Sequence, residues 1–188
     1  MLAQLIGNSA RTNSITLQRL LLKAWLLLLL IFTSPSSANT LDEYQVKAAF
    51  IYNFIAFTQW PYEINQPLNF CIYGEDYFGQ EIDHLQIKQI NSKPIHVLRF
   101  SQLEKVKVCQ ILFVSKSNIS NLPSILAFIQ GQSILTIADT PDAAIKGIMI
   151  NMVLAQNRIL FEINLQAVRN AKLDISSKLL QLATKVYQ

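Results

Sequence analysis

The stretch that decides the fold is Cys109-Gln110-Ile111-Leu112-Phe113-Val114-Ser115. Its near-uniform apolar character is typical of a central strand that is covered on both faces. Residues 68–74 predict a strand that ends at a glycine, and residues 133–139 predict another buried strand. Residues 94–100 alternate apolar and polar side chains, which predicts a strand with one wetter face. Strands that are buried on both faces need helices on both sides of the sheet, so helical segments are expected between them.

Helical patterns do lie between these strands, over residues 41–58, 76–85, 123–130 and, for one or two turns, 141–146. Alternation of strands and helices predicts a mostly parallel sheet with helices on both faces. The runs 148–154 and 158–163 are separated by a short polar gap and predict an antiparallel hairpin. We expect an α/β fold: a three-layer α/β/α sandwich with a mixed, mostly parallel sheet of about five or six strands and an antiparallel edge hairpin.

Two helices are expected after the hairpin. Asn164 stands between a strand and a helical segment over residues 165–171, so its side chain is expected to accept a hydrogen bond from the first helical turn. Ser176 or Ser177 can cap a last helix. The apolar stripe of that last helix is expected to comprise Leu179, Leu180, Leu182, Ala183 and Val186.

The N-terminal segment has the three regions of a secretory signal peptide. Residues 1–23 carry basic side chains and no acid, residues 24–32 are apolar, and small residues Ser36 and Ala38 precede the expected cut after Ala38. The alternative is an uncleaved anchor, but the apolar run is short for a membrane span of roughly 20 residues. We expect residues 1–38 to be removed on export and residues 39–188 to form a single periplasmic α/β domain.

The positive charge of the chain belongs largely to this leader. Three of the 16 basic residues lie within residues 1–38, which leaves 13 basic against 12 acidic residues in the rest of the chain. A nucleic-acid-binding domain needs a basic patch of its own. Nucleic acid is therefore not an expected partner.

The sequence offers little material for catalysis. His84 and His96 are the only histidines, and neither has a cysteine or acid at metal-ligand spacing. His84 is expected to be exposed and His96 to pack within the fold. The loop over residues 74–79 contains two carboxylates, which would repel a phosphate group. We expect a protein that is not an enzyme and that holds no metal or cofactor.

Cys71 and Cys109 are the two cysteines of the chain. In an oxidising compartment they are predicted to form a disulfide; the alternative is two buried thiols that do not meet. The first lies three residues before Gly74 and the second six before Ser115, so the two predicted strands would have to be staggered for the sulfur atoms to meet. Neither cysteine lies in a Cys-x-x-Cys redox motif, so a structural role is expected.

The first helix is rich in aromatic residues. Its three- and four-residue spacing predicts a buried stripe of Val46, Ala49, Phe50, Asn53, Phe54 and Phe57. Tyr44, Lys47 and Tyr52 fall off this stripe and are the candidate surface for a partner or a second copy. Core packing is the alternative role for these aromatic side chains.

A second candidate site is the crest, which we define as the carboxyl end of the parallel strands. Ligands of open α/β sheets bind at this edge. The crest residues are Gly74, Glu75, Asp76, Ser115 and Asp139.

The sequence resembles the YfiR family of periplasmic proteins. The stretch that carries most of the likeness is Val46-Lys47-Ala48-Ala49-Phe50-Ile51-Tyr52-Asn53-Phe54-Ile55-Ala56-Phe57-Thr58-Gln59-Trp60-Pro61. Shorter matching stretches follow in order over residues 74–79, 109–115, 134–139, 161–164 and 176–180. The resemblance thus spans essentially all of the chain after the leader.

This resemblance implies a compact periplasmic α/β domain that is often dimeric. It implies repression of a membrane-bound diguanylate cyclase through that enzyme's periplasmic sensor domain, with sequestration by an outer-membrane-linked lipoprotein. Cys71 and Cys109 match one cysteine pair of the family, whereas the second pair has no counterpart in residues 145–152. The expected function is a non-enzymatic regulator that lowers cyclic di-GMP signalling and biofilm formation. The alternative is a periplasmic module that binds a small ligand at the crest.

Overall fold

The computed structural model describes residues 39–188, apart from residue 65. The expected signal peptide over residues 1–38 lies outside this part. The helices, with 3-10 helices labelled η, are α2 (Asn39–Ala56), η2 (Glu81–Ile87), η3 (Leu103–Val108), η4 (Lys116–Asn121), α3 (Leu122–Phe128), α4 (Leu165–Asn170) and α5 (Ser177–Leu182). The strands are β1 (Thr58–Gln59), β2 (Leu68–Tyr73), β3 (Gln89–Ile90), β4 (Lys93–Phe100), β5 (Ile111–Val114), β6 (Leu135–Ala138), β7 (Ile150–Ala155), β8 (Arg158–Asn164), β9 (Asp174–Ile175) and β10 (Lys185–Tyr187). Within these residues, no helix combines the length and the apolar character that a membrane crossing requires.

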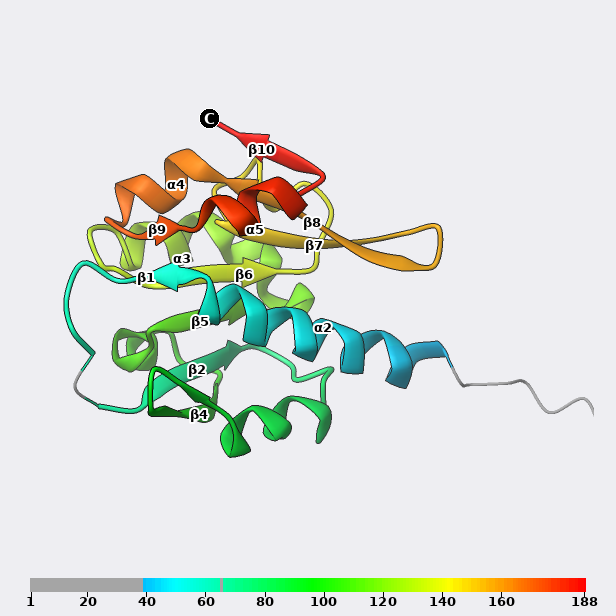
Figure 1. Cartoon of the computed structure of the whole chain (residues 1–188), viewed down its shortest axis with the longest axis horizontal. Helices are drawn as coiled ribbons and strands as arrows, with labels where there is room; N and C mark the ends of the chain where they lie inside the picture. Colours follow the sequence, from blue (N-terminus) through cyan, green and yellow to red (C-terminus); the bar gives the residue numbers. More distant parts are fainter. Residues whose placement is uncertain (1–38, 65) are drawn as a thin grey trace, which may run out of the picture. The chain divides into compact units, whose positions relative to one another are not determined.

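One mixed sheet organises this part of the chain (Figure 1). Its strand order is β10-β8-β7-β6-β5-β2-β4-β3. Neighbouring strands are parallel except for the β7–β8 hairpin and the β3–β4 pair, which are antiparallel. A separate two-stranded antiparallel pair joins β1 to β9. The α/β fold and the mixed, mostly parallel sheet are confirmed.

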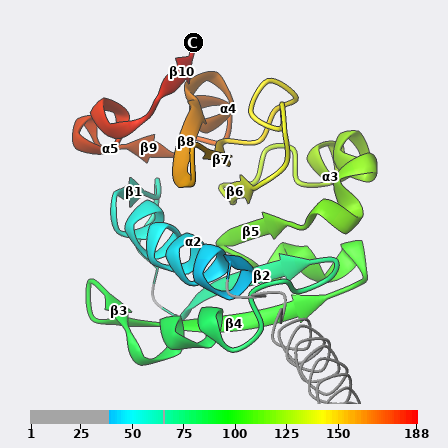
Figure 2. The same cartoon turned by 90° about the vertical axis from the view of Figure 1, so that its right-hand side faces the viewer.

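Helices cover both faces of this sheet, with α2 on one side and α3 on the other (Figure 2). Two buried clusters correspond to the two faces. The α2 cluster contains Phe54, Ile72 and Phe113, whereas the α3 cluster contains Leu112 and Ile125. Successive residues of β5 enter different clusters because strand side chains alternate between faces. This double covering explains why the sequence of β5 is apolar throughout.

The sheet has eight strands where about five or six were expected. The six predicted strands are all present, and the additional strands β3 and β10 are two and three residues long. The last helix was expected to extend to Val186, which was wrong. The backbone N–H and the hydroxyl of Thr184 both donate to the carbonyl oxygen of Phe161, each at 2.9 Å, and these bonds lead the chain onto the sheet edge as β10.

Two expected helices also differ from the structure. Residues 141–146 form turns, because Asp142 takes a left-handed backbone angle (φ 62°) that a helix cannot contain. The helix expected over residues 76–85 begins only at Glu81, since Asp76 closes a turn by accepting hydrogen bonds from the N–H groups of Phe78 and Gly79.

Cys71 and Cys109 form a disulfide, with 5.9 Å between their Cα atoms. The register difficulty does not arise, because Cys109 lies in the link between η3 and β5 and not on the strand. The backbone of this link does not follow the register of β5, so the sulfur of Cys109 can lie beside β2. On β2, Cys71 is paired in register with Leu112. The bond joins β2 to the segment that leads into the central strand.

Asn164 caps α4 as the sequence predicts, and it also binds a second element. Its Oδ1 accepts from the N–H of Ala167 at 2.8 Å, and its Nδ2 donates to the carbonyl oxygen of Ala144 at 2.8 Å. Asn164→Ala removes both bonds, and we expect it to lower the free energy of unfolding by about 2 kcal/mol. Chemical denaturation measures this loss. Asn164→Asp keeps the cap and loses only the donor, so its loss should be smaller; equal stability of Asn164→Ala and the wild type would contradict the cap.

Candidate functional site

The crest is occupied by a buried ionic cluster. Asp139, directly after β6, accepts from Lys47 of α2 at 2.6 Å, and both side chains are almost fully buried, at 3% and 4% exposure. Lys47 also pairs with Glu43 one turn earlier in α2, at 2.5 Å. A buried lysine is tolerated only when its charge is compensated, and here two carboxylates do so. The cluster fixes the first half of α2 against the carboxyl end of β6.

Tyr44 belongs to the same cluster. Its hydroxyl donates to Oδ2 of Asp139 at 3.2 Å, and the Nζ of Lys47 lies 4.2 Å from the centre of its ring. Burial, reinforced by the negative charge of Asp139, raises the pKa of Tyr44 well above its usual value. The hydroxyl therefore stays protonated and serves as a hydrogen-bond donor to the carboxylate.

The prediction that Tyr44, Lys47 and Tyr52 form an exposed partner surface is wrong for two of these residues. Tyr44 and Lys47 are buried, at 8% and 3% exposure, so they do not lie on a free surface. Tyr52 is half-buried; its hydroxyl donates to the carbonyl oxygen of Gln89 at 3.4 Å, and Lys88 lies over its ring. Candidate residues of α2 and of the crest therefore lie in one cluster, because Tyr44 and Lys47 both donate to Asp139.

The buried face of α2 is rotated relative to the expected stripe. Its buried residues are Tyr44, Lys47, Ala48, Ile51, Phe54 and Ile55. Val46, Ala49 and Asn53 of the expected stripe are exposed instead. The helix is apolar on more than one side, so periodicity alone could not distinguish the face that packs on the sheet from the face that remains open.

Gly74 brings two strand ends of the crest together. Its φ angle is 105°, and an added Cβ would lie 2.6 Å from Oγ of Ser117. That hydroxyl accepts from the N–H of Glu75 at 2.9 Å and lies 3.4 Å from Oγ of the buried Ser115. The close approach leaves the turn after β2 packed directly against the segment after β5.

Gly74→Ala should therefore destabilise the protein by about 2 kcal/mol, because it combines an unfavourable left-handed backbone with a close contact. Gly79→Ala is the matched control: Gly79 also has a positive φ, of 56°, but an added Cβ there would meet no atom within 4 Å. Thermal and urea unfolding of the two variants measure the difference. Equal losses would show that the contact with Ser117 is not restrictive.

Glu75 and its neighbours form the exposed rim of the crest. The hydroxyl of Tyr77 donates to Oε2 of Glu75 at 2.6 Å, and this hydrogen bond raises the pKa of Tyr77. Lys116, at the start of η4, lies 3.9 Å from the ring centre of Tyr77. The same ring stacks on Tyr44 with 6.1 Å between centroids, so it connects the rim to the buried cluster.

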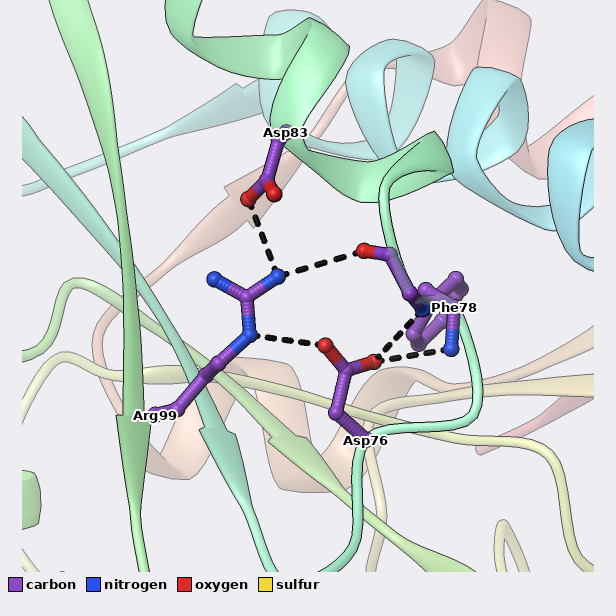
Figure 3. A network of polar contacts seen from close by, with 5 residues as sticks. Asp76, Phe78, Asp83 and Arg99 are labelled. Carbon is purple, nitrogen blue, oxygen red and sulfur yellow. Dashed lines mark hydrogen bonds and ion pairs between the residues drawn. The ribbon is translucent and has the colours of Figure 1, made fainter.

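Asp76 is engaged in holding its own loop. Arg99 of β4 donates through Nε to Asp76 at 2.7 Å and through Nη2 to Asp83 at 2.9 Å and to the carbonyl oxygen of Gly79 at 3.2 Å (Figure 3). The guanidinium thus joins the turn after β2 to η2 across the edge of the sheet. The sequence did not single out Arg99, whose role depends on strand pairing between β2 and β4.

A groove of about 360 Å³ separates α2 from the β7–β8 hairpin. Its residues are the apolar Val46, Phe50, Leu154 and Ile159 and the polar Glu43, Asn157 and Arg158. Leu154 is 53% exposed and Val46 39%. Gln156 and Asn157 both have positive φ angles, which make a tight two-residue hairpin turn and fix the wall of the groove. Sequence reasoning missed this groove because it assigned Val46 to the buried stripe. Phe50 does pack against the core, but it is only partly buried.

The histidines carry no site. His84 is exposed, as expected, and His96 is exposed on β4, so its assignment to packing was wrong. Among the described residues, no group of three or more His, Cys, Asp or Glu side chains is placed to hold a metal ion.

Comparison with known proteins identifies the family. The YfiR/HmsC-like family model matches residues 44–184, which include most of α2, the crest, the disulfide and the hairpin. The chain belongs to the YfiR/HmsC-like family. The family is one of periplasmic regulators of diguanylate cyclase signalling, and membership supports that general role for this protein. Among proteins with curated descriptions, none matches the sequence.

Solved structures show the same fold in this YfiR/HmsC-like chain. One is the ABC domain from Streptococcus pneumonia in complex with L-Trp, which is 10% identical and superposes with a TM-score of 0.52. The alignment covers 76% of this chain and 61% of that one, so the present chain spans less than two thirds of its length. At this level of identity the likeness concerns the α/β architecture alone.

Proposed function

We propose that the protein binds the periplasmic sensor domain of a membrane-bound diguanylate cyclase and represses the enzyme, which lowers cyclic di-GMP synthesis and biofilm formation. Family membership supports regulation of this signalling in general. The observation that carries the specific proposal is the open groove between α2 and the hairpin. Its lining combines apolar and polar side chains, as protein interfaces do.

The groove supports protein binding for two reasons. Its apolar side chains Val46 and Leu154 are exposed although they could bury further area against a partner. Its walls are a helix fixed by the Lys47–Asp139 pair and a hairpin closed by a tight turn, so little order has to be gained on binding. Arg158, an exposed residue of the groove lining, can pair with an acidic side chain of the partner.

The alternative, a small ligand at the crest, has less support. Asp139 is bound by Lys47 and Tyr44, Asp76 by Arg99, and Gly74 is packed on Ser117. These internal contacts occupy the groups that would otherwise face a ligand. The proposal also includes a homodimer and a lipoprotein that sequesters the protein. Light scattering of the purified protein measures whether it is a dimer.

Leu154→Asp should abolish binding of the cyclase, because it places a charge among the apolar side chains that line the groove. In the experiment, membrane proteins are captured on the immobilised protein and identified by mass spectrometry. Wild-type protein is expected to retain a diguanylate cyclase, and Leu154→Asp to lose it. Ile145→Asp is the control, since Ile145 is similarly exposed, at 59% against 53% for Leu154, but lies outside the groove. Retention of the cyclase by Leu154→Asp would show that the groove is not the contact surface.

A further inference from the structure

A second pocket, of about 470 Å³, opens between α3 and α4 and shares no residue with the crest or the groove. Its floor is apolar, with Ile129 after α3, Ile134 before β6 and Met149 before β7, all buried. Its polar residues include Gln130, Gln132 and Asn170, whose amide groups both donate and accept hydrogen bonds. This volume lies in the range of small-molecule sites, roughly 300–1,000 Å³.

No charged side chain is among the described residues that line this pocket. The other large pockets differ in this respect: the groove contains Glu43 and Arg158, and the pocket beside Trp60 contains Glu63 and Lys93. An ionised ligand group that left water for an apolar floor without a counter-charge would lose much of its solvation energy. The pocket therefore favours a molecule without a net charge.

The walls of the pocket are held by hydrogen bonds between separate elements. Oγ of Ser133 donates to the carbonyl oxygen of Ala171 at 2.8 Å, and the N–H of Met149 donates to Oγ1 of Thr136 at 3.0 Å. Gly147 allows the loop before β7 to approach α3, since an added Cβ would lie 2.7 Å from Leu126. The cavity thus exists before any ligand arrives, which lowers the cost of binding.

We propose that this pocket binds an uncharged, mainly apolar small molecule that carries an amide or hydroxyl group. The buried apolar side chains take the body of the molecule. The exposed amide of Gln130 binds its polar group, since the amides of Gln132 and Asn170 already bond to Phe128 and Gln166. The proposal does not depend on the partner assigned to the groove.

The test uses protein purified from the periplasm and labelled with ¹³C at its methionine methyl groups. Met149 lines the pocket, whereas Met152 is buried in β7 outside it and serves as an internal reference. The probes are acetanilide, a neutral aromatic amide, and 4-acetamidobenzoate, its carboxylate analogue. Acetanilide is expected to shift the Met149 resonance saturably and to leave Met152 nearly unchanged. The carboxylate analogue should bind about tenfold more weakly or worse.

Ala167→Phe fills the pocket from α4 and should remove the saturable shift, whereas Ala127→Phe, at an exposed position of α3 outside the lining, should retain it. The comparison of the two probes uses the wild type and decides the question even where Ala167→Phe fails to fold. The absence of a saturable Met149 shift with acetanilide, or equal affinity for the two probes, would overturn the proposal.

Discussion

Asp139→Asn is expected to lower the free energy of unfolding by about 3 kcal/mol. The substitution leaves the ammonium group of Lys47 buried with Glu43 as its remaining carboxylate partner, and it weakens the acceptor of the Tyr44 hydroxyl. Loss of one partner from a buried pair costs about 3–5 kcal/mol, and the lower end applies because Glu43 stays in place. Urea denaturation with circular dichroism measures the loss.

The control for this prediction is Asp174→Asn, which removes the charge of an exposed carboxylate in β9. Its stability should remain close to that of the wild type. The double substitution Lys47→Met with Asp139→Leu removes both buried charges and should recover much of the lost stability, because apolar side chains often replace a buried ion pair without cost. If Asp139→Asn unfolds at the same urea concentration as Asp174→Asn, the pair does not stabilise α2 on the sheet.

Reduction of the Cys71–Cys109 disulfide should cost about 4 kcal/mol of stability. The bond closes a loop with a sequence separation of 38 residues, and the loop-entropy relation gives this figure for a chain of that length. Both sulfur atoms are buried, so reductant acts chiefly on the opened protein. Denaturation with and without reductant measures the effect, which should be absent in the Cys71→Ala, Cys109→Ala double variant.

Thiol titration provides the independent check on this bond. Unreduced protein that has been denatured should expose no free thiol. Two reactive thiols per chain would show that the cysteines are only packed together, and the loss on reduction would then have another cause.

The arrangement of the sheet could be predicted because burial leaves a clear pattern in the sequence. The double covering of β5 makes residues 111–114 apolar throughout, and the polar gap before Arg158 marks the hairpin. Short edge strands leave no such pattern. β10 has three residues, and its position depends on hydrogen bonds from Thr184 to Phe161, which no local property of the sequence reveals.

The candidate site could be predicted less completely than the fold. Asp139 and Gly74 each follow a strand, so their position at the carboxyl end of the sheet could be predicted. The partner of Asp139 comes from a helix more than ninety residues earlier in the chain. A lysine on a helix is normally exposed, and only the tertiary structure shows that Lys47 is buried. The sequence also does not show which face of α2 packs on the sheet, and for this reason the exposure of Val46 could not be predicted.

The most direct test of the proposed regulation is the cellular level of cyclic di-GMP. Deletion of the gene is expected to raise this level, and restoration of the wild-type protein or of Ile145→Asp is expected to lower it again. Leu154→Asp, present in the periplasm at the same amount, should fail to lower it. An unchanged cyclic di-GMP level after deletion, or full repression by Leu154→Asp, would contradict repression through the groove between α2 and the hairpin.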